Sequence, residues 1–329
     1  MRPAGRSGII GDVSAEVRID PYDPGWPARF EEERALLEGV LDGWITGGIH
    51  HAGSTAVPGL AAKPVIDILV GVADLDRARP CIEPLAGLGY LYAPYRPDEM
   101  LWFCKPSPER RTHHLHVVPT GSPRFRAELG FRDHLRAHRL VAADYEALKR
   151  ELAERFPHDR EAYTEAKSDF VRGVVAAHEE ELAERAREVE ALHAHLVMWA
   201  RGRPDVRALA IVGSWARGGG RLDADLDVIV LAASPEQMAS SEEWLGELGL
   251  PPVVERRQWG PIAERRVRLP SGLEVELGVG PASWASGDPL DPGTRGVVRD
   301  GLLILHDPEG LLEAARLRAE RPATPRRRP

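Results

Sequence analysis

Apolar positions along the chain form two successive series of strand-like and helix-like segments, one in each half. In the first half, helical spacing follows Trp26 and Pro27, four apolar runs have the length of strands, and a helical pattern runs from 123 to about 181. The second half predicts helices at 235–248 and 309–319 and strands at 207–212, 226–231, 253–258, 264–269, 273–279 and 302–305. This order predicts an α/β (α+β) protein in which each half is a small mixed sheet flanked by helices.

A charged, alanine-rich helix over 179–200 separates the two series. The Arg-Gly-Arg-Pro sequence at 201–204 ends it, because glycine and proline do not continue a helix. A chain of 329 residues is long for one domain and sufficient for two. We therefore predict a leader at 1–16, a first domain at 17–178, a linker helix at 179–204, a second domain at 205–319 and a basic tail at 320–329.

Two aspartates at the start of a strand are the strongest chemical signal in the second half. An apolar run ends at Gly213 and Ser214, a loop follows, and the next strand begins beside Asp225 and Asp227. Side chains two positions apart in a strand point to the same face, so the two carboxylates lie side by side. Like charges this close are unfavourable unless a cation lies between them. Hard oxygen ligands in this arrangement predict Mg²⁺ shared with substrate phosphates.

The loop before these aspartates predicts a phosphate site. Gly213 allows the backbone to approach a phosphate closely, and Ser214 and its neighbouring amides can donate hydrogen bonds to phosphate oxygens. Arg217 follows three residues later and is the expected charged donor. We therefore predict that Gly213, Ser214 and Arg217 bind a nucleotide.

A third carboxylate is expected from a later strand. Glu276 lies in the apolar run at 273–279, and Glu274 shares its face and is the alternative. We expect Asp225, Asp227 and Glu276 to be both metal ligands and catalytic residues, as in a site where metal ions hold the phosphates of an in-line displacement. Glu276 could also act as the base for an acceptor hydroxyl.

A Gly-Ser loop followed by a strand with an aspartate also occurs near the N-terminus. Gly53 and Ser54 are followed by an apolar run that contains Asp67, and Ser54 and Asp67 are separated by 13 positions, as are Ser214 and Asp227. A match at a constant offset of 160 residues indicates an internal repeat. The two halves are thus expected to be tandem copies of one fold.

The first copy has lost most of the carboxylates. The offset aligns Val65 with Asp225, and it carries Glu276 onto His116 and Glu274 onto His114. Since insertions could make the histidine match accidental, we give it less weight than the earlier ones. Valine cannot bind a metal, so the first copy is not expected to form a two-metal site.

Two interpretations of the N-terminal residues stay open. The first is a hydrogen-bonded polar cluster without a chemical role. The second is a site for an anion or substrate, with His116 and Asp67 as a proton-transfer pair and Lys63 as a phosphate or carboxylate contact. This secondary N-terminal cleft would comprise Gly53, Ser54, Lys63, Asp67, His114 and His116.

Composition narrows the classes of partner. The net charge of −8 argues against a nucleic-acid partner, which would favour a basic surface. The chain contains no run of about 18 apolar residues, so no membrane span is predicted. The N-terminal residues lack the apolar core of a signal peptide, and the two cysteines are too few for a disulfide framework. We expect a cytoplasmic protein with reduced thiols.

Lysine is rare among the basic residues. Only four of 43 are lysine, and all of them lie in the first half. They are candidates for positions that need a compact ammonium group rather than a guanidinium. The four are Lys63, Lys105, Lys149 and Lys167.

Longer stretches resemble known families. The first half resembles the GrpB family over about 17–176, through 21–27, 51–70, 112–117, 131–136 and 162–168. That resemblance implies a nucleotidyltransferase fold without a defined reaction. The Gly-Ser and Asp-x-Asp elements, with the stretch at 301–310, resemble the minimal and aminoglycoside nucleotidyltransferases over about 205–316.

Three functions are compatible with these patterns. The first is a Mg²⁺-dependent enzyme that moves a nucleoside monophosphate, with AMP the expected group, from a nucleoside triphosphate such as ATP to a hydroxyl of a small molecule or protein. The second is a binding or regulatory protein that holds nucleotide or an anionic metabolite without turnover. The third is a distinct group transfer or ligation in the first domain. The complete set of Asp225, Asp227 and Glu276 favours the first.

Overall fold

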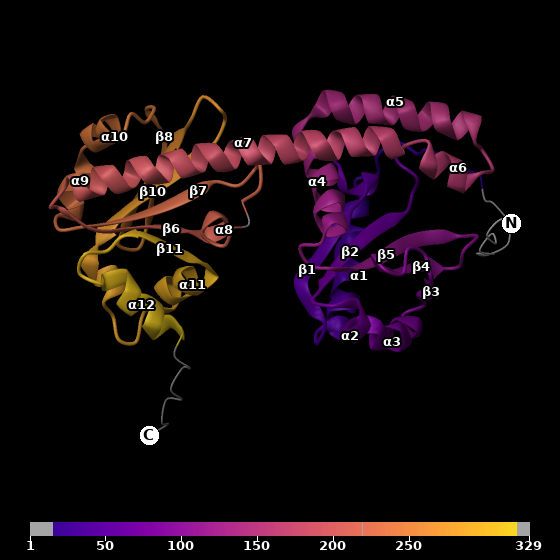
Figure 1. The fold of residues 1–329 in the computed structure, drawn as a ribbon, viewed down its shortest axis with the longest axis horizontal. Coiled ribbons are helices and arrows are strands. Elements are labelled where there is room, and N and C mark those ends of the chain that lie inside the picture. Colours follow the sequence, from indigo (N-terminus) through magenta and orange to yellow (C-terminus); the bar gives the residue numbers. More distant parts are fainter. Residues whose placement is uncertain (1–15, 219, 321–329) are drawn as a thin grey trace, which may run out of the picture. The chain divides into compact units, whose positions relative to one another are not determined.

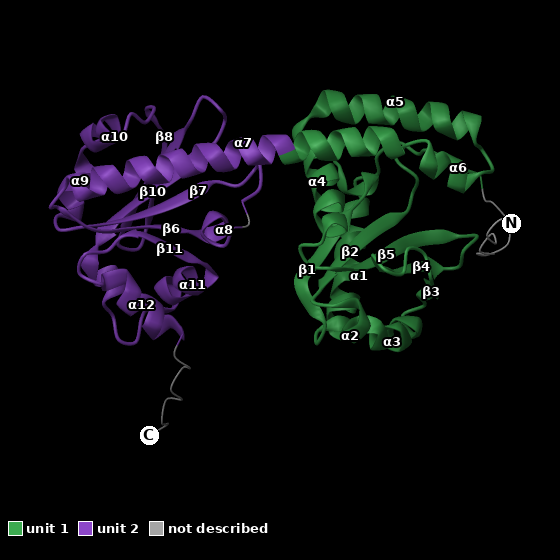
Figure 2. Cartoon of the chain, in the orientation of Figure 1, with its two compact units in different colours: residues 1–179 green, residues 180–329 purple. Residues whose placement is uncertain are grey.

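The computed structural model describes residues 16–218 and 220–320. The chain forms two compact units, residues 1–179 and residues 180–329 (Figures 1 and 2). The expected leader and basic tail lie outside the described residues, apart from residues 16 and 320. No helix in the described part is long and apolar enough to span a membrane. Each unit has one mixed sheet flanked by helices, which confirms the predicted α/β architecture.

A five-stranded sheet forms the centre of unit 1, in the order β1-β2-β5-β4-β3. β2 pairs in parallel with β5, and the other pairs are antiparallel. β2 has the sequence Ile-Asp-Ile-Leu-Val-Gly-Val, so Asp67 is its one polar residue and its two faces are otherwise apolar. The strands are β1 (Ile45–Ala52), β2 (Ile66–Val72), β3 (Leu91–Ala93), β4 (Leu101–Pro106) and β5 (Arg111–Pro119).

Helices cover both faces of this sheet. α1, α2 and α3 pack on one face, where Phe30 and Leu85 are buried. α4 packs on the other face through Phe125, beside Leu69. Its N-cap is Ser122, whose hydroxyl accepts a hydrogen bond from the Phe125 amide. The helices are α1 (Trp26–Leu41), α2 (Leu75–Ala78), α3 (Ile82–Gly87), α4 (Pro123–Ala137), α5 (Arg139–Arg155) and α6 (Arg160–Glu165), with 3-10 turns at Ser54–Ala56 and Arg79–Cys81.

Unit 2 contains a six-stranded sheet in the order β11-β6-β7-β10-β9-β8. β7 pairs in parallel with β10, and the other pairs are antiparallel. The one polar residue of β7 is Asp227, so this strand repeats the composition of β2. The strands are β6 (Val206–Val212), β7 (Leu226–Ala232), β8 (Val253–Trp259), β9 (Ile262–Arg268), β10 (Glu274–Pro281) and β11 (Leu302–His306).

The helices of unit 2 also divide between the two faces of its sheet. Trp244 of α10 is buried in one core cluster, and Val298 of α11 and Leu312 of α12 are buried in another. The single helix expected at 235–248 is two short helices, because the backbone at Ser241 is extended. The helices are α8 (Gly213–Ala216), α9 (Pro235–Ser240), α10 (Glu243–Glu247), α11 (Pro292–Asp300) and α12 (Leu311–Glu320), with a 3-10 turn at Ala282–Ala285.

The helix expected as a linker at 179–204 is the second part of a longer helix. α7 (Ser168–Arg201) is continuous over 34 residues. Its first part packs through Val174 in a cluster of unit 1, and its last part buries Val189 and Leu196 in the core of unit 2. Because its end contributes to that core, this segment is structural in unit 2 rather than a free connection.

The two sheets share one strand order and one pattern of directions. β1-β2-β5-β4-β3 corresponds to β6-β7-β10-β9-β8, and β11 is an addition beside β6. Ala52 lies opposite Asp67 and Val212 lies opposite Asp227, so the register agrees with the offset of 160 residues. The tandem repeat inferred from spacing is therefore present in the fold.

The histidine match of that repeat is wrong by two residues. Asp67 lies opposite His114, whereas Asp227 lies opposite Glu276. The separations along the chain are 47 and 49 residues, so the second copy has two additional residues between its paired strands. His114, and not His116, is therefore the counterpart of Glu276.

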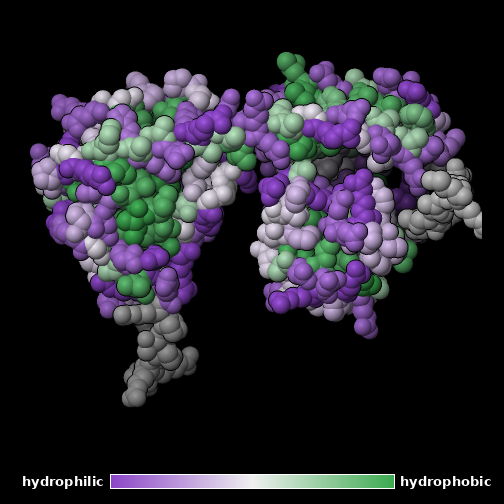
Figure 3. All heavy atoms as spheres, in the orientation of Figure 1, coloured by the Kyte–Doolittle hydropathy of each residue, from purple (hydrophilic) through white to green (hydrophobic). Residues whose placement is uncertain are grey.

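Charged and polar side chains cover most of the surface in the view of Figure 3. The face of unit 2 in that view also carries one compact area of apolar side chains. Exposed large apolar residues of this unit include Val297, Leu303 and Leu317. Burial of apolar surface is therefore incomplete on unit 2.

We expect limited proteolysis of the full chain to cut α7 between residues 179 and 188. None of these residues is buried, whereas Trp199 and Ala200 at the end of the helix are part of the core. Two fragments that each unfold cooperatively, followed by mass spectrometry and thermal melting, would agree with this expectation. Cleavage at 201–204 instead, or fragments without a melting transition, would contradict it.

Candidate functional site

Three carboxylates converge at one end of the sheet in unit 2. Asp227 is the second residue of β7 and lies in register with Glu276 of the parallel strand β10. Residues in register on neighbouring strands point to the same face, so both side chains project from one side of the sheet. Asp225 directly precedes β7, two positions before Asp227. The structure thus brings together the three residues singled out in the sequence.

Gly213 gives the aspartate room. It follows β6 with a positive φ of 71°, and a Cβ atom there would lie 2.6 Å from Oδ2 of Asp227. A larger residue would meet both the strained backbone and the carboxylate, so glycine is required. Ser214 follows directly and is half-buried. Its hydroxyl therefore belongs to the same end of the sheet as Asp227.

An arginine lies among these carboxylates. Arg266 of β9 is in register with Glu276, and its guanidinium donates hydrogen bonds to Glu276 and, at 2.8 Å, to Glu274. Its Nη2 atom lies 3.7 Å from Oδ2 of Asp225. One cation of the chain itself therefore contacts three of the acidic residues.

The contacts separate the two candidates for the third carboxylate. Glu276 is in register with Asp227, whereas Glu274 lies at the first position of β10 and also accepts a hydrogen bond from the exposed Arg268. That hydrogen bond is the main cause that holds the pKa of Glu274 below its usual range. Glu276 is thus the better placed partner of Asp227.

Without a bound cation, the ionised forms of Asp225 and Asp227 are unfavourable. Burial raises the pKa of Asp227 to about 6, and the charges of Asp225 and Glu264 add to this effect against the opposing charge of Arg266. Burial also raises the pKa of Asp225. A divalent cation would remove the repulsion, and hard carboxylate oxygens are the donors that Mg²⁺ prefers. The donor set therefore fits Mg²⁺.

Two residues of this site escaped the sequence analysis, Arg266 and Glu264. Glu264 is 8% exposed; Trp259 donates a hydrogen bond to its Oε2 atom, and its buried Oε1 atom has no hydrogen-bond partner among residues 16–218 and 220–320. Residues 264–266 are all charged, so the alternation of apolar and polar positions along the strand does not reveal which of them face the aspartates. Only the pairing of β9 with β10 decides it.

Arg217 does not point to the carboxylates. Its Nη1 atom lies 2.6 Å from the carboxylate of Asp300, and it also donates to the carbonyl oxygen of Asp300. Both side chains of this ion pair are well exposed, and ion pairs at the surface contribute little to stability. A role in nucleotide binding would require Arg217 to leave Asp300.

Unit 1 has the same backbone arrangement with a different second residue. Gly53 has a φ of 65°, and a Cβ atom there would lie 2.1 Å from Oδ2 of Asp67. Nδ1 of His114 lies 2.9 Å from Oδ1 of Asp67, so a histidine takes the place that Glu276 has in unit 2. Val65 directly precedes β2, as Asp225 precedes β7. Asp67 therefore has no second carboxylate beside it at this point of the fold.

Asp67 and His114 form a carboxylate–imidazole pair. Burial opposes the charge of Asp67, but the hydrogen bond from His114 and the charges of His114, His116 and Lys63 outweigh it and lower the pKa. Burial is the main cause that lowers the pKa of His114, and the charges of His116 and Lys63 add to it against the opposing effect of Asp67. A neutral imidazole that donates from Nδ1 leaves the lone pair of Nε2 available. That buried Nε2 atom has no hydrogen-bond partner in the described part of the chain.

His116 is engaged elsewhere. Its Nδ1 atom lies 2.9 and 3.0 Å from the two carboxylate oxygens of Glu128. Burial lowers the pKa of His116, but the charge and hydrogen bond of Glu128 together with the charge of Asp67 raise it overall. The hydrogen bonds therefore pair Asp67 with His114 and His116 with Glu128, while the charges of His116 and Asp67 act on each other.

The remaining residues of the N-terminal cleft lie near this pair. Ser54 begins the 3-10 turn after Gly53 and is half-buried. Lys63 precedes β2, and the charges of Lys63 and Asp67 act on each other. Burial lowers the pKa of Lys63 to about 8. All six residues expected at this cleft are thus at one end of the sheet or beside it.

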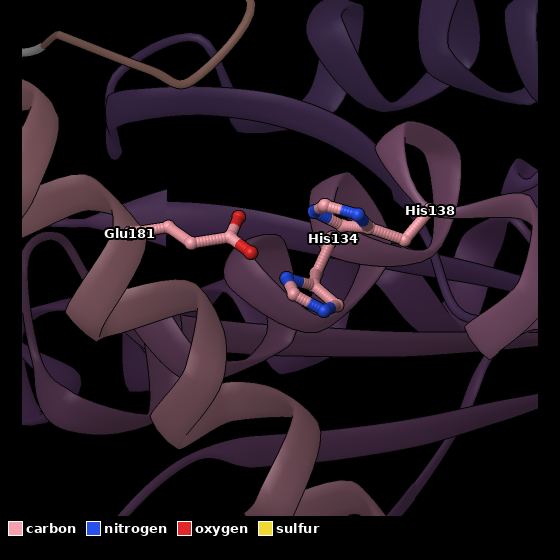
Figure 4. Close-up of side chains that lie close together, drawn as sticks. All are labelled: His134, His138 and Glu181. Atoms are coloured by element: carbon pink, nitrogen blue, oxygen red, sulfur yellow. The ribbon is translucent and has the colours of Figure 1, made fainter. Parts of the chain in front are cut away.

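A further polar group was not singled out in the sequence. His134 on α4 and His138 are four residues apart, and ligand atoms of these histidines and of Glu181 on α7 lie within 4.8 Å of one another (Figure 4). The spacing His-x-x-x-His on a helical pattern was the available signal. Imidazole and carboxylate groups are ligands that zinc accepts.

The comparisons with known proteins concern mainly the first unit. The family described as GrpB protein matches residues 16–177. Glutamate-rich protein GrpB of Alkalihalophilus pseudofirmus is 37% identical over 168 residues, which are 50% of this chain and 96% of that protein. A UPF0157 protein of Pseudomonas aeruginosa is 42% identical over 161 residues, which are 47% of this chain and 64% of that protein.

A solved structure gives a similar coverage. The crystal structure of conserved protein GrpB from Enterococcus faecalis matches with 31% identity and a TM-score of 0.46, over 49% of this chain and 96% of that chain. The two mixed sheets define a class of tandem α/β proteins with a Gly-Ser loop beside a strand aspartate in each unit. Within that class, the chain belongs to the GrpB family through its first unit.

The raised pKa of Asp227 predicts a pH dependence of stability. The ordinary pKa of an aspartate is 3.8 and that of Asp227 is about 6, so between these values the folded chain binds the proton more tightly than the unfolded chain. The free energy of unfolding should therefore decrease as the pH rises through this window. Without divalent cations, we expect Asp227→Asn to remove this decrease and to raise the Tm at pH 7, by about 2–4 °C for each kcal/mol.

Thermal melts between pH 4 and 8 in a chelating buffer test this expectation. Asp223→Asn is the matched control, because Asp223 is an exposed acidic residue on the same loop. Equal pH slopes for the wild type and Asp227→Asn would show that Asp227 is not the responsible group.

Proposed function

We propose that unit 2 transfers a nucleoside monophosphate, with AMP as the expected group, from a nucleoside triphosphate to a hydroxyl of a small molecule or protein, with Mg²⁺. The observation that carries the proposal is the convergence of Asp225, Asp227 and Glu276 beside Gly213 and Ser214. Partly buried carboxylates that repel one another are found where a cation completes a site. The matched relatives support only the membership of unit 1 in its family, so the reaction is proposed on residues of unit 2 alone.

Each residue has a role in this proposal. Asp225, Asp227 and Glu276 would hold Mg²⁺, which when bound supplies positive charge at the phosphate oxygens. The Ser214 hydroxyl would donate to a phosphate oxygen, at a position that the missing side chain of Gly213 keeps open. Once Arg266 has left Glu276, this carboxylate can accept the proton of the acceptor hydroxyl.

A second function is a binding or regulatory role without turnover. The observation in its favour is Arg266, whose guanidinium already neutralises Glu276 and Glu274. If this arginine never leaves, the site holds one cation of its own and has less need of a metal ion. Metal affinity and turnover distinguish the two functions.

Removal of one aspartate should abolish metal-dependent nucleotide binding. We expect Asp225→Asn and Asp227→Asn each to reduce the affinity for ATP·Mg²⁺ at least tenfold in calorimetry, because a neutral amide replaces an anionic ligand. If turnover is present, kcat should decrease by orders of magnitude while KM changes less. Asp223→Asn should retain the wild-type values, since Asp223 is not among the proposed ligands. Unchanged affinity in the Asp225/Asp227 double variant would exclude the metal assignment.

Arg266 should compete with the metal ion. We expect Arg266→Met to bind Mg²⁺ more tightly than the wild type in the absence of nucleotide, because it removes a cation that contacts Glu276, Glu274 and Asp225. Magnesium titration followed by the increase in Tm measures this affinity. Arg268→Met is the matched control on the same strand, since its hydrogen bond goes to Glu274 and it contacts neither Glu276 nor Asp225 among the described residues. Weaker Mg²⁺ binding by Arg266→Met would instead assign the arginine a supporting role.

A further inference from the structure

Three of the four lysines of the chain gather at one place in unit 1. Lys63 lies before β2, Lys149 lies on α5, and Lys167 lies between α6 and α7. They come from three separate segments, and we call them the lysine cluster. In a chain that uses arginine for 39 of its 43 basic residues, three converging lysines are not explained by general surface composition.

Two of these ammonium groups share one aromatic ring. The Nζ atom of Lys63 lies 4.9 Å from the ring centre of Tyr163, and that of Lys167 lies 4.4 Å from the same ring centre. Lys149 is 2% exposed and donates a hydrogen bond to the carbonyl oxygen of Ala61. Lys63 and Lys167 are half-buried. Cation–π contacts stabilise the ammonium groups only in part.

No carboxylate forms an ion pair with the lysine cluster among the described residues, although the charge of Glu146 acts on Lys149. In the described ranges 16–218 and 220–320, no carboxylate oxygen lies within 4.0 Å of the Nζ atom of any of the three lysines. Asp67 acts on Lys63 and Lys167 from a greater distance, and Arg160 and Arg111 add positive charge to the surroundings of Lys63. Buried cations without a partner are unfavourable, and a bound anion would supply the missing charge.

A second observation points to a ligand at the same place. Tyr163 is 0% exposed, and its buried hydroxyl group has no hydrogen-bond partner among the described residues. The buried Nε2 atom of His114 is likewise without a partner there. Native proteins satisfy nearly all buried polar atoms, so unsatisfied atoms beside uncompensated charge indicate a missing polar group.

We propose that the lysine cluster binds the phosphate group of a small phosphorylated molecule, with Lys63 and Lys167 as its direct contacts. Compact ammonium groups bind phosphate as point charges, and those of Lys63 and Lys167 lie 4.9 and 4.4 Å from the centre of the Tyr163 ring. The Asp67–His114 pair lies beside this anion, and the lone pair on Nε2 of His114 can accept a hydrogen bond from a hydroxyl of the same molecule. Unit 1 therefore binds an anion without a metal ion, independently of the function proposed for unit 2.

The pKa values of the lysines set the pH range of binding. Burial lowers the pKa of Lys63 to about 8 and that of Lys167 to about 7, and Lys63 further lowers the pKa of Lys167. Both ammonium groups become more charged as the pH falls through this range, whereas phosphate monoesters keep their second charge above about pH 6. Affinity should therefore be greatest near pH 6–7 and should decrease toward pH 9.

Pyridoxal 5′-phosphate is the probe that tests this site in the full chain. It carries a phosphate group and an aldehyde, and the aldehyde condenses with a neutral lysine amine, losing water, to an imine that borohydride reduces to a stable secondary amine. With four lysines in the chain, peptide mapping assigns every modified side chain. Lys105 is the internal control, because it lies in the same unit and is paired with Glu33 at 2.9 and 3.0 Å.

We expect modification of Lys63 or Lys167 at least tenfold faster than that of Lys105. Inorganic phosphate, pyrophosphate, ribose 5-phosphate and ATP are tested as protecting compounds at constant ionic strength. Protection by any of them supports the site, and the compound that protects at the lowest concentration identifies the class of ligand. Modification no faster than at Lys105, or equal protection by chloride, would overturn the proposal.

Variants separate this site from the one in unit 2. Lys63→Met and Lys167→Met keep the length of the side chain and should lose at least tenfold in affinity for the protecting compound, measured by calorimetry. Both should fold, and their Tm at pH 7 should not decrease, because a buried charge is removed. Asp225→Asn should leave the protection unchanged. If both lysine variants melt as the wild type does and retain full phosphate affinity, the assignment is wrong.

Discussion

The parallel pairing of two central strands is the constraint on which both candidate sites depend. It joins β2 to β5 and β7 to β10, and so brings residues 47 or 49 positions apart in the chain into register. A shift of one residue would turn the partner of the aspartate to the other face of the sheet. The register is held because the remaining positions of β2 and β7 are almost all apolar and must stay buried.

One backbone arrangement supports opposite electrostatic conditions in the two units. In unit 2, several carboxylates crowd together, and the guanidinium of Arg266 contacts Asp225, Glu274 and Glu276. In unit 1, a histidine replaces the second carboxylate, and the charges of His114, His116 and Lys63 act on the aspartate. The first set favours a cation and the second an anion. A duplicated fold with changed side chains can therefore serve two kinds of ligand, because the glycine and the strand register are kept while the charges are exchanged.

The sequence alone predicted the elements and the repeat well, but it misassigned one residue of the N-terminal cleft. Apolar periodicity located most strands and the helix that begins at Trp26, because a strand or helix in a small domain must bury one face. Spacing also identified the repeat through Gly53, Asp67, Gly213 and Asp227, since the loop after the first strand has one length in both copies. The same spacing misassigned His116, because two added residues lie in a later connection where loop length is not constrained.

The sequence by itself determined the strand aspartates, the glycines that make room for them and the low use of lysine, because these depend on residue type and local spacing. Tertiary structure alone decided that Arg266 lies opposite Glu276, that His114 is the partner of Asp67, and that Lys63 and Lys167 meet at Tyr163. These contacts join segments far apart in the chain. The charged residues involved have no regular spacing in the sequence. Only the pairing of strands and the packing of helices, driven by burial of apolar surface, brings them together.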